Sequence, residues 1–285
     1  MPEERSVQAG NQRPLVFVDL DDTLFQTARK MGKGGPRHVA AMDAGGQPNS
    51  YMSRVQRSFA DWLLACADVV PVTARSVEAY GRVRLPFAHG AICAYGGVLL
   101  DTRGRPDLPW REQMEQKLGS FQERLPVLCE SVLAIGADAG FSLRGWVVAE
   151  GGLRLYMVVK RNAPDVAGRN GPDIAGQSAA DAVVPKAADD AAALAEVLAA
   201  VRARGLLAGM RVHLNGNNLA FLPDGLDKGP AVREWLRRDR ELQGERPVLG
   251  FGDSLTDLGF MGACHLWGTP SGGQLAQAVE AAVHG

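Results

Sequence analysis

The sequence predicts an α/β protein, with a doubly wound parallel sheet as its core and an inserted α+β domain. Two observations carry this prediction. Toward both ends of the chain, short apolar segments rich in β-branched residues alternate with helical patterns, as in buried parallel strands joined by helices. Between them, helical patterns are followed by pairs of alternating strands, which is typical of a separate α+β module. A chain of 285 residues, 46% of them apolar, is long enough to bury a core in each module.

The outer elements support the doubly wound core. Residues 14–19 are a continuously apolar segment that ends in carboxylates, which indicates a buried strand whose carboxyl end opens onto a site. Three later segments have the same character, and helical patterns lie between and after them. The further predicted strands are 69–73, 91–94 and 247–251, and the predicted helices are 53–67, 76–83, 229–240 and 272–283.

The middle of the chain predicts an inserted domain with the order αββαββ. Each of its two hairpins follows a helical pattern, and the first turns at Glu150-Gly151-Gly152. Residues 162–185, rich in Pro and Gly, predict a mobile loop. The predicted elements are helix 108–139, strands 141–149 and 153–160, helix 186–204, and strands 210–214 and 219–222. The predicted domains are a flexible tail at 1–13, a core at 14–101 and 224–285, and the insert at 102–223.

Charge and cysteine content exclude some classes of function. The chain has 31 Lys and Arg against 32 Asp and Glu, a formal net charge of −1, whereas proteins that neutralise nucleic-acid phosphates carry a basic excess. Its four cysteines form no CxxC pair and lie in apolar stretches, so we expect buried, reduced thiols. The polar N-terminal residues and the absence of a long apolar run predict no signal peptide and no membrane span. We therefore expect a cytoplasmic protein with neither nucleic-acid nor membrane partners.

Two carboxylates follow the first predicted strand directly. Asp19 and Asp21 are two residues apart on an extended segment, so their side chains point the same way beyond the strand end. Clustered carboxylates repel each other unless a cation or a shared proton relieves the repulsion. Alone, this pair is as consistent with a solvated turn as with a site.

Other chemically useful residues follow the remaining strands. Thr73 ends the second predicted strand, Lys228 opens a helix, and Asp253 and Asp257 follow the strand at 247–251. Because ligands in a doubly wound sheet bind beyond the carboxyl ends of the strands, we expect these side chains at one edge. A hydroxyl, an ammonium and several carboxylates suit Mg²⁺ together with a phosphoryl group.

In this arrangement the sequence resembles the haloacid dehalogenase superfamily of phosphohydrolases, because all four motifs of that family occur in order. They are the segment Asp19 to Thr23, then Thr73, then Lys228, then the segment Gly252 to Asp257. The insert resembles the α/β cap of the Cof-type and sugar-phosphate phosphatase branch in its order and position. The resemblance implies a Rossmann-like catalytic core, a cap and phosphatase activity.

The resemblance also implies roles for single residues. Asp19 would be the nucleophile that forms an aspartyl-phosphate, and Asp21 the general acid and then the general base. Thr73 and Lys228 would bind and stabilise the phosphoryl group. Mg²⁺ would bind Asp19, the backbone carbonyl of Asp21, and Asp253, with Asp257 either a ligand or a support for Lys228. Further expected substrate-binding residues of the core are Asp22, Thr23, Arg75 and Gly96.

Two departures from the family pattern bear on the site. The third predicted strand is followed by Tyr95, where many Cof-type members have Asn. The segment 26–51, between the first and second motifs, is longer than expected, Gly-rich and basic. It is interpreted either as a flap that helps to bind an anionic substrate or as a disordered surface loop.

Alternation along the strands of the insert separates a polar face from an apolar one. If helices cover the apolar face, the polar face is where substrate specificity would lie. A sheet face that is merely solvated is the other reading of the same pattern. The predicted substrate-reading residues are Arg144, Trp146, Arg154, Tyr156, Lys160, Arg211 and His213.

The function predicted from these residues is an Mg²⁺-dependent phosphatase of a small phosphorylated metabolite, such as a sugar phosphate or glycosyl phosphate. The main alternative is a phosphotransferase or mutase of the phosphomannomutase kind that uses the same site. A receiver-type signalling module and a non-catalytic metabolite-binding protein are the alternatives from other classes. The sequence makes no prediction of the oligomeric state.

Overall fold

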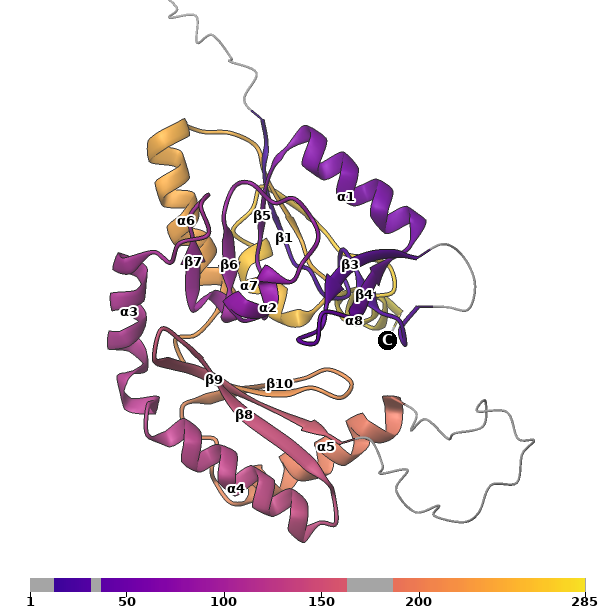
Figure 1. The fold of residues 1–285 in the computed structure, drawn as a ribbon, viewed down its shortest axis with the longest axis vertical. Coiled ribbons are helices and arrows are strands. Elements are labelled where there is room, and N and C mark those ends of the chain that lie inside the picture. Colours follow the sequence, from indigo (N-terminus) through magenta and orange to yellow (C-terminus); the bar gives the residue numbers. More distant parts are fainter. Residues whose placement is uncertain (1–12, 32–36, 163–186, 285) are drawn as a thin grey trace, which may run out of the picture. The chain divides into compact units, whose positions relative to one another are not determined.

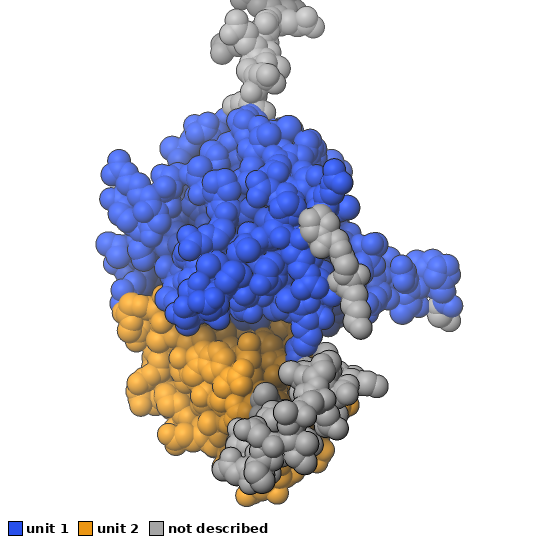
Figure 2. Space-filling view, turned by 45° about the vertical axis from the view of Figure 1, so that its right-hand side comes forward, with its two compact units in different colours: residues 1–114, 226–285 blue, residues 115–225 orange. Residues whose placement is uncertain are grey.

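The computed structural model describes residues 13–31, 37–162 and 187–284, without the side chains of 187 and 188. The chain divides into two compact units (Figure 2), one formed by 1–114 and 226–285 and the other by 115–225. The predicted tail and the predicted loop at 162–185 therefore lie outside the described residues, apart from their edges. One edge residue, Arg13, donates hydrogen bonds to Ala65 O and Ala67 O and is not part of a free tail.

A four-stranded parallel sheet is the centre of the first unit, as the sequence predicts. Its order is β13-β12-β1-β5, and β1 is paired in parallel on both sides, with Leu15 opposite Asp68 and Val248. All four residues of β1 are buried. The central strand of the sheet is thus the first strand of the chain. The strands are β1 (Leu15–Val18), β5 (Asp68–Pro71), β12 (Val248–Phe251) and β13 (Leu266–Gly268).

A short antiparallel pair continues the line of strands beyond β5. Val72 forms a parallel bridge to Ile92 in β6 (Ala91–Cys93), and β6 pairs with β7 (Val98–Leu100). Thr73, next to this bridge, donates its backbone N–H to Ile92 O at 2.8 Å. The carboxyl end of β5 is therefore fixed between β1 and β6.

The helices of the first unit begin mostly at residues that suit their N-termini. The Ser53 side chain accepts from Gln56 N, and Gln56 Oε1 accepts from Ser53 N, so α1 begins with a capping box. The side chain of Asp227 caps the helix that Lys228 opens. The helices are α1 (Arg54–Cys66), α2 (Val77–Gly81), α3 (Leu108–Leu118), α6 (Lys228–Gln243), α7 (Leu258–Met261) and α8 (Gln274–His284).

The extra segment after β1 forms a small sheet that the sequence analysis did not predict. Its strands are β2 (Gln26–Thr27), β3 (His38–Met42) and β4 (Pro48–Met52), in the antiparallel order β2-β4-β3. Ala40, Ala41 and Met52 join the buried core of the first unit. Over the described residues, the interpretation as a disordered loop is therefore wrong.

The second unit has the predicted αββαββ order, with one antiparallel sheet in the order β10-β11-β9-β8. Helices α4 and α5 cover one face of that sheet (Figure 1). The helix predicted over 108–139 is wrong in one respect, because a 3₁₀ turn at Gly119–Phe121 separates α3 from α4. The elements are α4 (Arg124–Asp138), β8 (Leu143–Glu150), β9 (Leu153–Arg161), α5 (Ala187–Ala203), β10 (Met210–Leu214) and β11 (Leu219–Pro223).

The core of the second unit lies between this sheet and its two helices. Leu155, Met157 and Val159 of β9 are fully buried on the helix side. Gly136 of α4 allows the closest approach, because a Cβ there would lie 2.2 Å from Leu143 Cδ1. Alternation along β9 therefore separates this apolar face from one that carries Arg154, Tyr156 and Lys160, as predicted, and also the buried Val158.

The four cysteines are free. Cys93 and Cys129 are buried, but Cys66 is exposed at the end of α1, so the prediction of a buried thiol is wrong there. Within the part of the chain that the structure describes, no helix has the length and apolar character needed to cross a membrane.

Candidate active site

Asp19 follows β1 at the edge of the sheet where the strands end. Its backbone N–H donates to Phe251 O at 2.8 Å, which continues the ladder to β12 and places the loop after β12 beside it. Asp253 lies in that loop, and both carboxylates are buried. The parallel pairing of β1 and β12 thus brings together two residues from opposite ends of the sequence, as the sequence analysis predicts.

Lys228 links the two acidic loops. Its Nζ donates to Asp19 Oδ1 and to Asp257 Oδ1, both at 2.7 Å, and its side chain is 3% exposed. Burial alone would lower the pKa of Lys228, but the charges of Asp19 and Asp257 outweigh burial, so its pKa is raised. The ammonium is therefore held charged at the start of α6.

Asp257 is occupied by donors on both of its oxygens. Lys228 donates to Oδ1, while Ser254 donates its backbone N–H to Oδ2 at 2.9 Å and its hydroxyl to Oδ2 at 2.8 Å. Asp257 is fully buried. Of the two roles expected for this residue, the contacts favour the support of Lys228.

Asp19, Asp253 and Asp257 form a candidate cation site, because each offers a carboxylate oxygen and these oxygens lie within 4.8 Å of one another. Burial raises the pKa of Asp19 well above its usual range, with Lys228 opposing and the other two carboxylates adding to the increase. Burial, then repulsion by Asp257, raises the pKa of Asp253 to about 7. Lys228 supplies only one positive charge for three carboxylates, so the cluster retains negative charge that a cation would balance. Carboxylate oxygens are also the hard donors that Mg²⁺ prefers, so the cluster fits this ion.

The turn after Asp19 is tight and strained. Asp22 has φ +67°, a left-handed conformation that is uncommon outside glycine, and its N–H donates to Phe25 O at 2.7 Å. Its carboxylate forms an ion pair with Lys30. Thr23 Oγ1 lies 3.5 Å from Asp253 Oδ1. Both predicted substrate-binding residues of this turn thus have protein partners, and their substrate role stays a prediction.

Asp21 is held by Arg75 rather than by the acidic cluster. Arg75 Nε donates to Asp21 Oδ2 and Nη2 to Asp21 Oδ1, both at 2.7 Å, which is a bidentate ion pair. Arg75 follows Thr73 by two residues, and its backbone N–H donates to Thr73 Oγ1 at 3.1 Å. The end of β5 is thereby tied to the turn after β1.

The chain after β6 is also strained. Ala94 and Tyr95 have φ of +51° and +56°, and Gly96 has φ +90°. A Cβ on Gly96 would lie 2.3 Å from the backbone oxygen of Asp227, so only glycine allows this close approach to the start of α6. Gly96 O accepts from Trp110 Nε1 at 2.9 Å. The expected substrate contact of Gly96 stays a prediction.

The register of the second unit places the predicted substrate-reading residues on one face of its sheet. Arg144 pairs with Lys160, and His213 pairs with Ala220, which pairs with Val158. Residues in register, or two apart on one strand, share a face. Tyr156 is buried, and the others are at least partly exposed. The seven residues on this face are Arg144, Trp146, Arg154, Tyr156, Lys160, Arg211 and His213.

Two contacts on this face bear on those predictions. Arg154 Nη1 donates to Gln122 O at 2.9 Å and lies 3.3 Å from Glu123 Oε1, so this guanidinium already has partners inside the second unit. Lys160 Nζ lies 5.9 Å from the centre of the Trp146 ring, a cation–π contact. The substrate role of these residues is a prediction that no contact within the unit tests.

Comparisons with known proteins bear on the fold. No protein-family model matches the chain, and no curated protein matches its sequence. A solved structure from Eubacterium rectale is 14% identical, with 96% of this chain and 92% of the other covered, at a TM-score of 0.50. Also similar are a haloacid dehalogenase-like hydrolase from Bacteroides thetaiotaomicron (14% identity, 95% and 100% covered, TM-score 0.46) and the sucrose-phosphatase from Synechocystis sp. (14%, 96% and 98%, 0.45).

At these identities the likeness concerns the fold, and it spans both units. The chain shares its fold with the solved structure from Eubacterium rectale. In this fold the four motifs named above fall at the ends of β1, β5 and β12 and at the start of α6.

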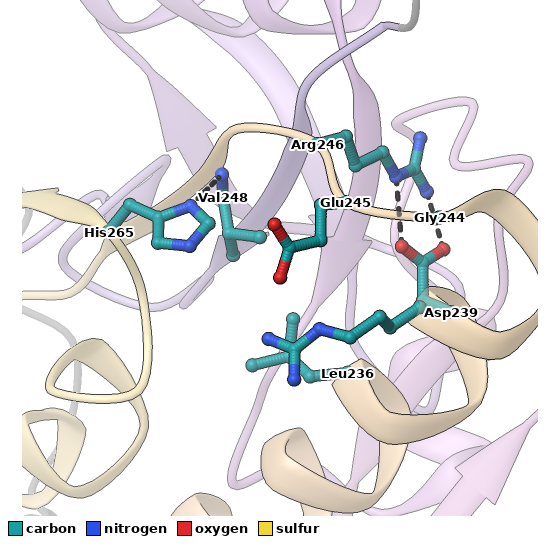
Figure 3. A pocket seen from close by; sticks show the side chains of 8 residues that line it. Leu236, Asp239, Gly244, Glu245, Arg246, Val248 and His265 are labelled. Carbon is teal, nitrogen blue, oxygen red and sulfur yellow. Dashed lines mark hydrogen bonds and ion pairs between the residues drawn. The ribbon is translucent and has the colours of Figure 1, made fainter. Parts of the chain in front are cut away.

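The small pocket shown in Figure 3 is not this site. Its lining residues include Asp239, Arg246 and His265, at the opposite end of β12, where Val248 begins the strand. The cavity volume is about 20 Å³, room for about one water. Arg246 forms a bidentate ion pair with Asp239, so this end of the sheet holds structural contacts.

The sequence analysis did not predict three contacts that support the site. Lys30 pairs with Asp22, Ser50 lies 3.4 Å from Arg75 Nη2, and the guanidinium of Arg75 lies 5.1 Å from the centre of the Phe25 ring. Lys30 and Ser50 belong to the extra segment after β1. The unexpected length and basic character of that segment were the signal that it contributes to the site.

Proposed function

We propose that the protein is an Mg²⁺-dependent phosphatase that hydrolyses a small phosphorylated metabolite through an aspartyl-phosphate. The observation that carries the proposal is the pair of 2.7 Å bonds from Lys228 to Asp19 and Asp257, with Asp253 beside them. A buried ammonium among three carboxylates at the carboxyl ends of parallel strands suits the binding of a phosphoryl group next to a cation.

In the first step, an Asp19 oxygen attacks phosphorus, and the bond from phosphorus to the ester oxygen breaks. Asp21 gives a proton to the leaving oxygen. Lys228 supports this step by offsetting the negative charge around Asp19, and Thr73 would donate a hydrogen bond to the phosphoryl group. Bound Mg²⁺, held by Asp19, Asp253 and the carbonyl of Asp21, would neutralise charge on the phosphoryl oxygens.

In the second step, water attacks the phosphorus of the aspartyl-phosphate. Asp21, now a carboxylate, accepts the proton of that water, and the bond between phosphorus and Asp19 breaks. Inorganic phosphate leaves, and the Asp19 carboxylate is regenerated. One side chain thus serves both proton transfers, which makes its placement important for both steps.

For the substrate, the proposal names a sugar phosphate or glycosyl phosphate. Aromatic and basic side chains share one face of the sheet of the second unit, and such residues suit sugar rings and anionic groups. The proposed location is the cytoplasm, which is supported by four free cysteines.

A phosphate-release screen tests the function. The purified protein is offered sugar phosphates, nucleotides and cofactor phosphates, with and without Mg²⁺. We expect turnover of some sugar phosphates that needs Mg²⁺ and is lost in Asp19→Asn. The matched control is Asp61→Asn, since Asp61 lies on the exposed side of α1 in a surface ion pair with Arg57.

Two results would contradict the proposal. If the protein hydrolyses none of these phosphate esters in the presence of Mg²⁺, the proposed phosphatase activity is excluded. Transfer of the phosphoryl group to a second sugar without release of free phosphate identifies a phosphotransferase or mutase instead.

A further inference from the structure

The geometry points to Arg75 as a positioning residue that fixes the orientation of the Asp21 carboxylate for proton transfer, rather than as a ligand of the substrate. This inference rests on the proposed function, because it assigns a task within the same reaction. The sequence analysis expected Arg75 to bind substrate, whereas its contacts in the structure indicate that it holds Asp21.

The first observation is the ion pair itself. Both oxygens of Asp21 accept from Arg75, at 2.7 Å from Nε and 2.7 Å from Nη2. A planar guanidinium that engages both oxygens of a carboxylate fixes its plane as well as its position. The carboxylate of Asp21 is therefore held in one orientation in the turn after β1.

The second observation is the difference in exposure between the partners. The Arg75 side chain is 15% exposed and that of Asp21 is 45% exposed. The guanidinium thus lies behind the carboxylate, while the carboxylate is accessible. This arrangement suits a side chain that reaches a substrate and a partner that holds it from within the protein.

The third observation is that the nitrogens of the guanidinium are all directed at protein atoms. Nε and Nη2 donate to Asp21, Nη1 lies 3.4 Å from Ala79 O, and Nη2 also lies 3.4 Å from Ser50 Oγ. The ring of Phe25 lies under the guanidinium at 5.1 Å. Ser50 is 1% exposed in β4. If Arg75 bound the phosphoryl group of the substrate, the N–H groups of its guanidinium would instead have to point at the substrate.

Together these contacts indicate that the extra segment after β1 helps to position the proposed acid–base residue. Ser50 of β4 and the Phe25 ring just before β2 hold Arg75, which holds Asp21. An acid–base residue must be within hydrogen-bond reach of its proton partner, and small misplacements cost large factors in rate. Fixing Asp21 before substrate binds avoids that loss in both steps.

The test is a double-mutant cycle read with two substrates. The variants are Arg75→Ala, Asp21→Asn and both together, assayed in the full chain on the best sugar phosphate and on an aryl phosphate. An aryl oxide is a stable leaving group and needs little help from a general acid. A sugar alkoxide is strongly basic, so its departure depends on protonation by the general acid. The matched control is Arg57→Ala on the exposed side of α1.

We expect Arg75→Ala to lower kcat on the sugar phosphate by about 10²-fold, with a much smaller loss on the aryl phosphate and little change in KM. In the Asp21→Asn background, the same substitution should cost less than about twofold, because the residue it positions is already disabled. Arg75→Lys, which keeps the charge without the bidentate contact, should show the same leaving-group pattern with a smaller loss.

Other outcomes overturn the inference. An equal loss from Arg75→Ala in both backgrounds, or a raised KM with similar losses on both substrates, would identify Arg75 as a substrate ligand. If Arg75→Ala does not fold, Arg75→Lys and Ser50→Ala decide by the same leaving-group comparison. An inactive wild-type protein contradicts the proposed function, whereas an active one with uniform losses contradicts only this inference.

Discussion

Lys228 holds the acidic cluster together, and its removal leaves buried carboxylates without their cation. We expect Lys228→Met to lower kcat by about 10²- to 10³-fold and to destabilise the metal-free protein by about 3–5 kcal/mol. Urea denaturation measures the second effect. The loss of stability should shrink from pH 8 to pH 5, because protonation removes the repulsion among the carboxylates. An equal loss at both pH values would contradict this account of the site.

The raised pKa of Asp253 predicts how the proposed binding of Mg²⁺ depends on pH. In the metal-free protein its pKa is raised to about 7 by burial, with Asp257 and Asp22 adding to the increase and Lys228 and Lys30 opposing it. Under the proposed function Mg²⁺ would bind the ionised form of Asp253, so protons would compete with the metal below pH 7. We expect Mg²⁺ affinity to fall by up to about tenfold per pH unit below pH 7 for one displaced proton. Calorimetric titration between pH 6 and 8 measures this, and a constant affinity would contradict it.

At this scale, sequence predicts the positions of the proposed catalytic and metal-binding residues better than the contacts that support them. Asp19, Lys228 and Asp253 follow strands or open a helix, so backbone topology alone brings them to one edge. The partner of Arg75 was not predictable, because a long side chain with several torsions can reach many carboxylates. Only the three-dimensional arrangement of β4 and the turn after β1 selects Asp21.

Among the elements, the approach of the chain after β6 to the start of α6 depends on one glycine. Placing an alanine in a left-handed backbone conformation costs about 1–3 kcal/mol. We expect Gly96→Ala to destabilise the protein by more than this, because the Cβ of the new alanine would also lie 2.3 Å from Asp227 O. Gly104→Ala is the matched control, since Gly104 also has a positive φ but nothing within 4 Å of a Cβ. Chemical denaturation compares the two, and equal losses would show that the close approach is not limiting.

The elements that sequence predicts well are those with a long or strongly apolar pattern. Helices α1 and α6 and strands β1, β5 and β12 lie close to their expected ranges. Strands β2, β7 and β13 have two or three residues each, too few to show a period, and they exist because of their pairing partners. The break after α3 follows from Gly119, a poor helix former whose effect the long helical pattern concealed.

Over the whole first unit, the two ends of the parallel sheet have different tasks. At the end opposite to Asp19, Arg246 forms ion pairs with Asp68 of β5 and Asp239 of α6. We expect Arg246→Met to destabilise the protein by about 3 kcal/mol, because it removes the ion pair of the partly buried Asp239 and leaves Asp68 with only Arg13 and His89. The value of kcat/KM should not change, since the described contacts of Arg246, with Arg13, Asp68 and Asp239, lie at this end of the sheet. A lower kcat/KM in the folded variant would contradict this separation of tasks.

The same network predicts a pH dependence of stability. Although burial of Asp68 acts to raise its pKa, the bonds from Arg246 and the charge of His89 lower it overall. A carboxyl group with a lowered pKa contributes stability above its unfolded pKa of about 3.9, and this contribution is lost as pH falls through the folded pKa. The difference in stability between wild type and Arg246→Met should therefore narrow below about pH 4.

The pairing of β1 with both β5 and β12 also has a consequence for how the protein is made. On the ribosome, β1 and β5 can pair early, but one side of β1 stays without its neighbour until β12 has emerged, after the entire second unit. Domains fold as the chain appears, and pairings distant in sequence form slowly. The nascent chain thus exposes an apolar strand edge for most of its synthesis, and Asp19 meets Asp253 only near the end. A nascent chain stalled before β12 should be the species that chaperones bind.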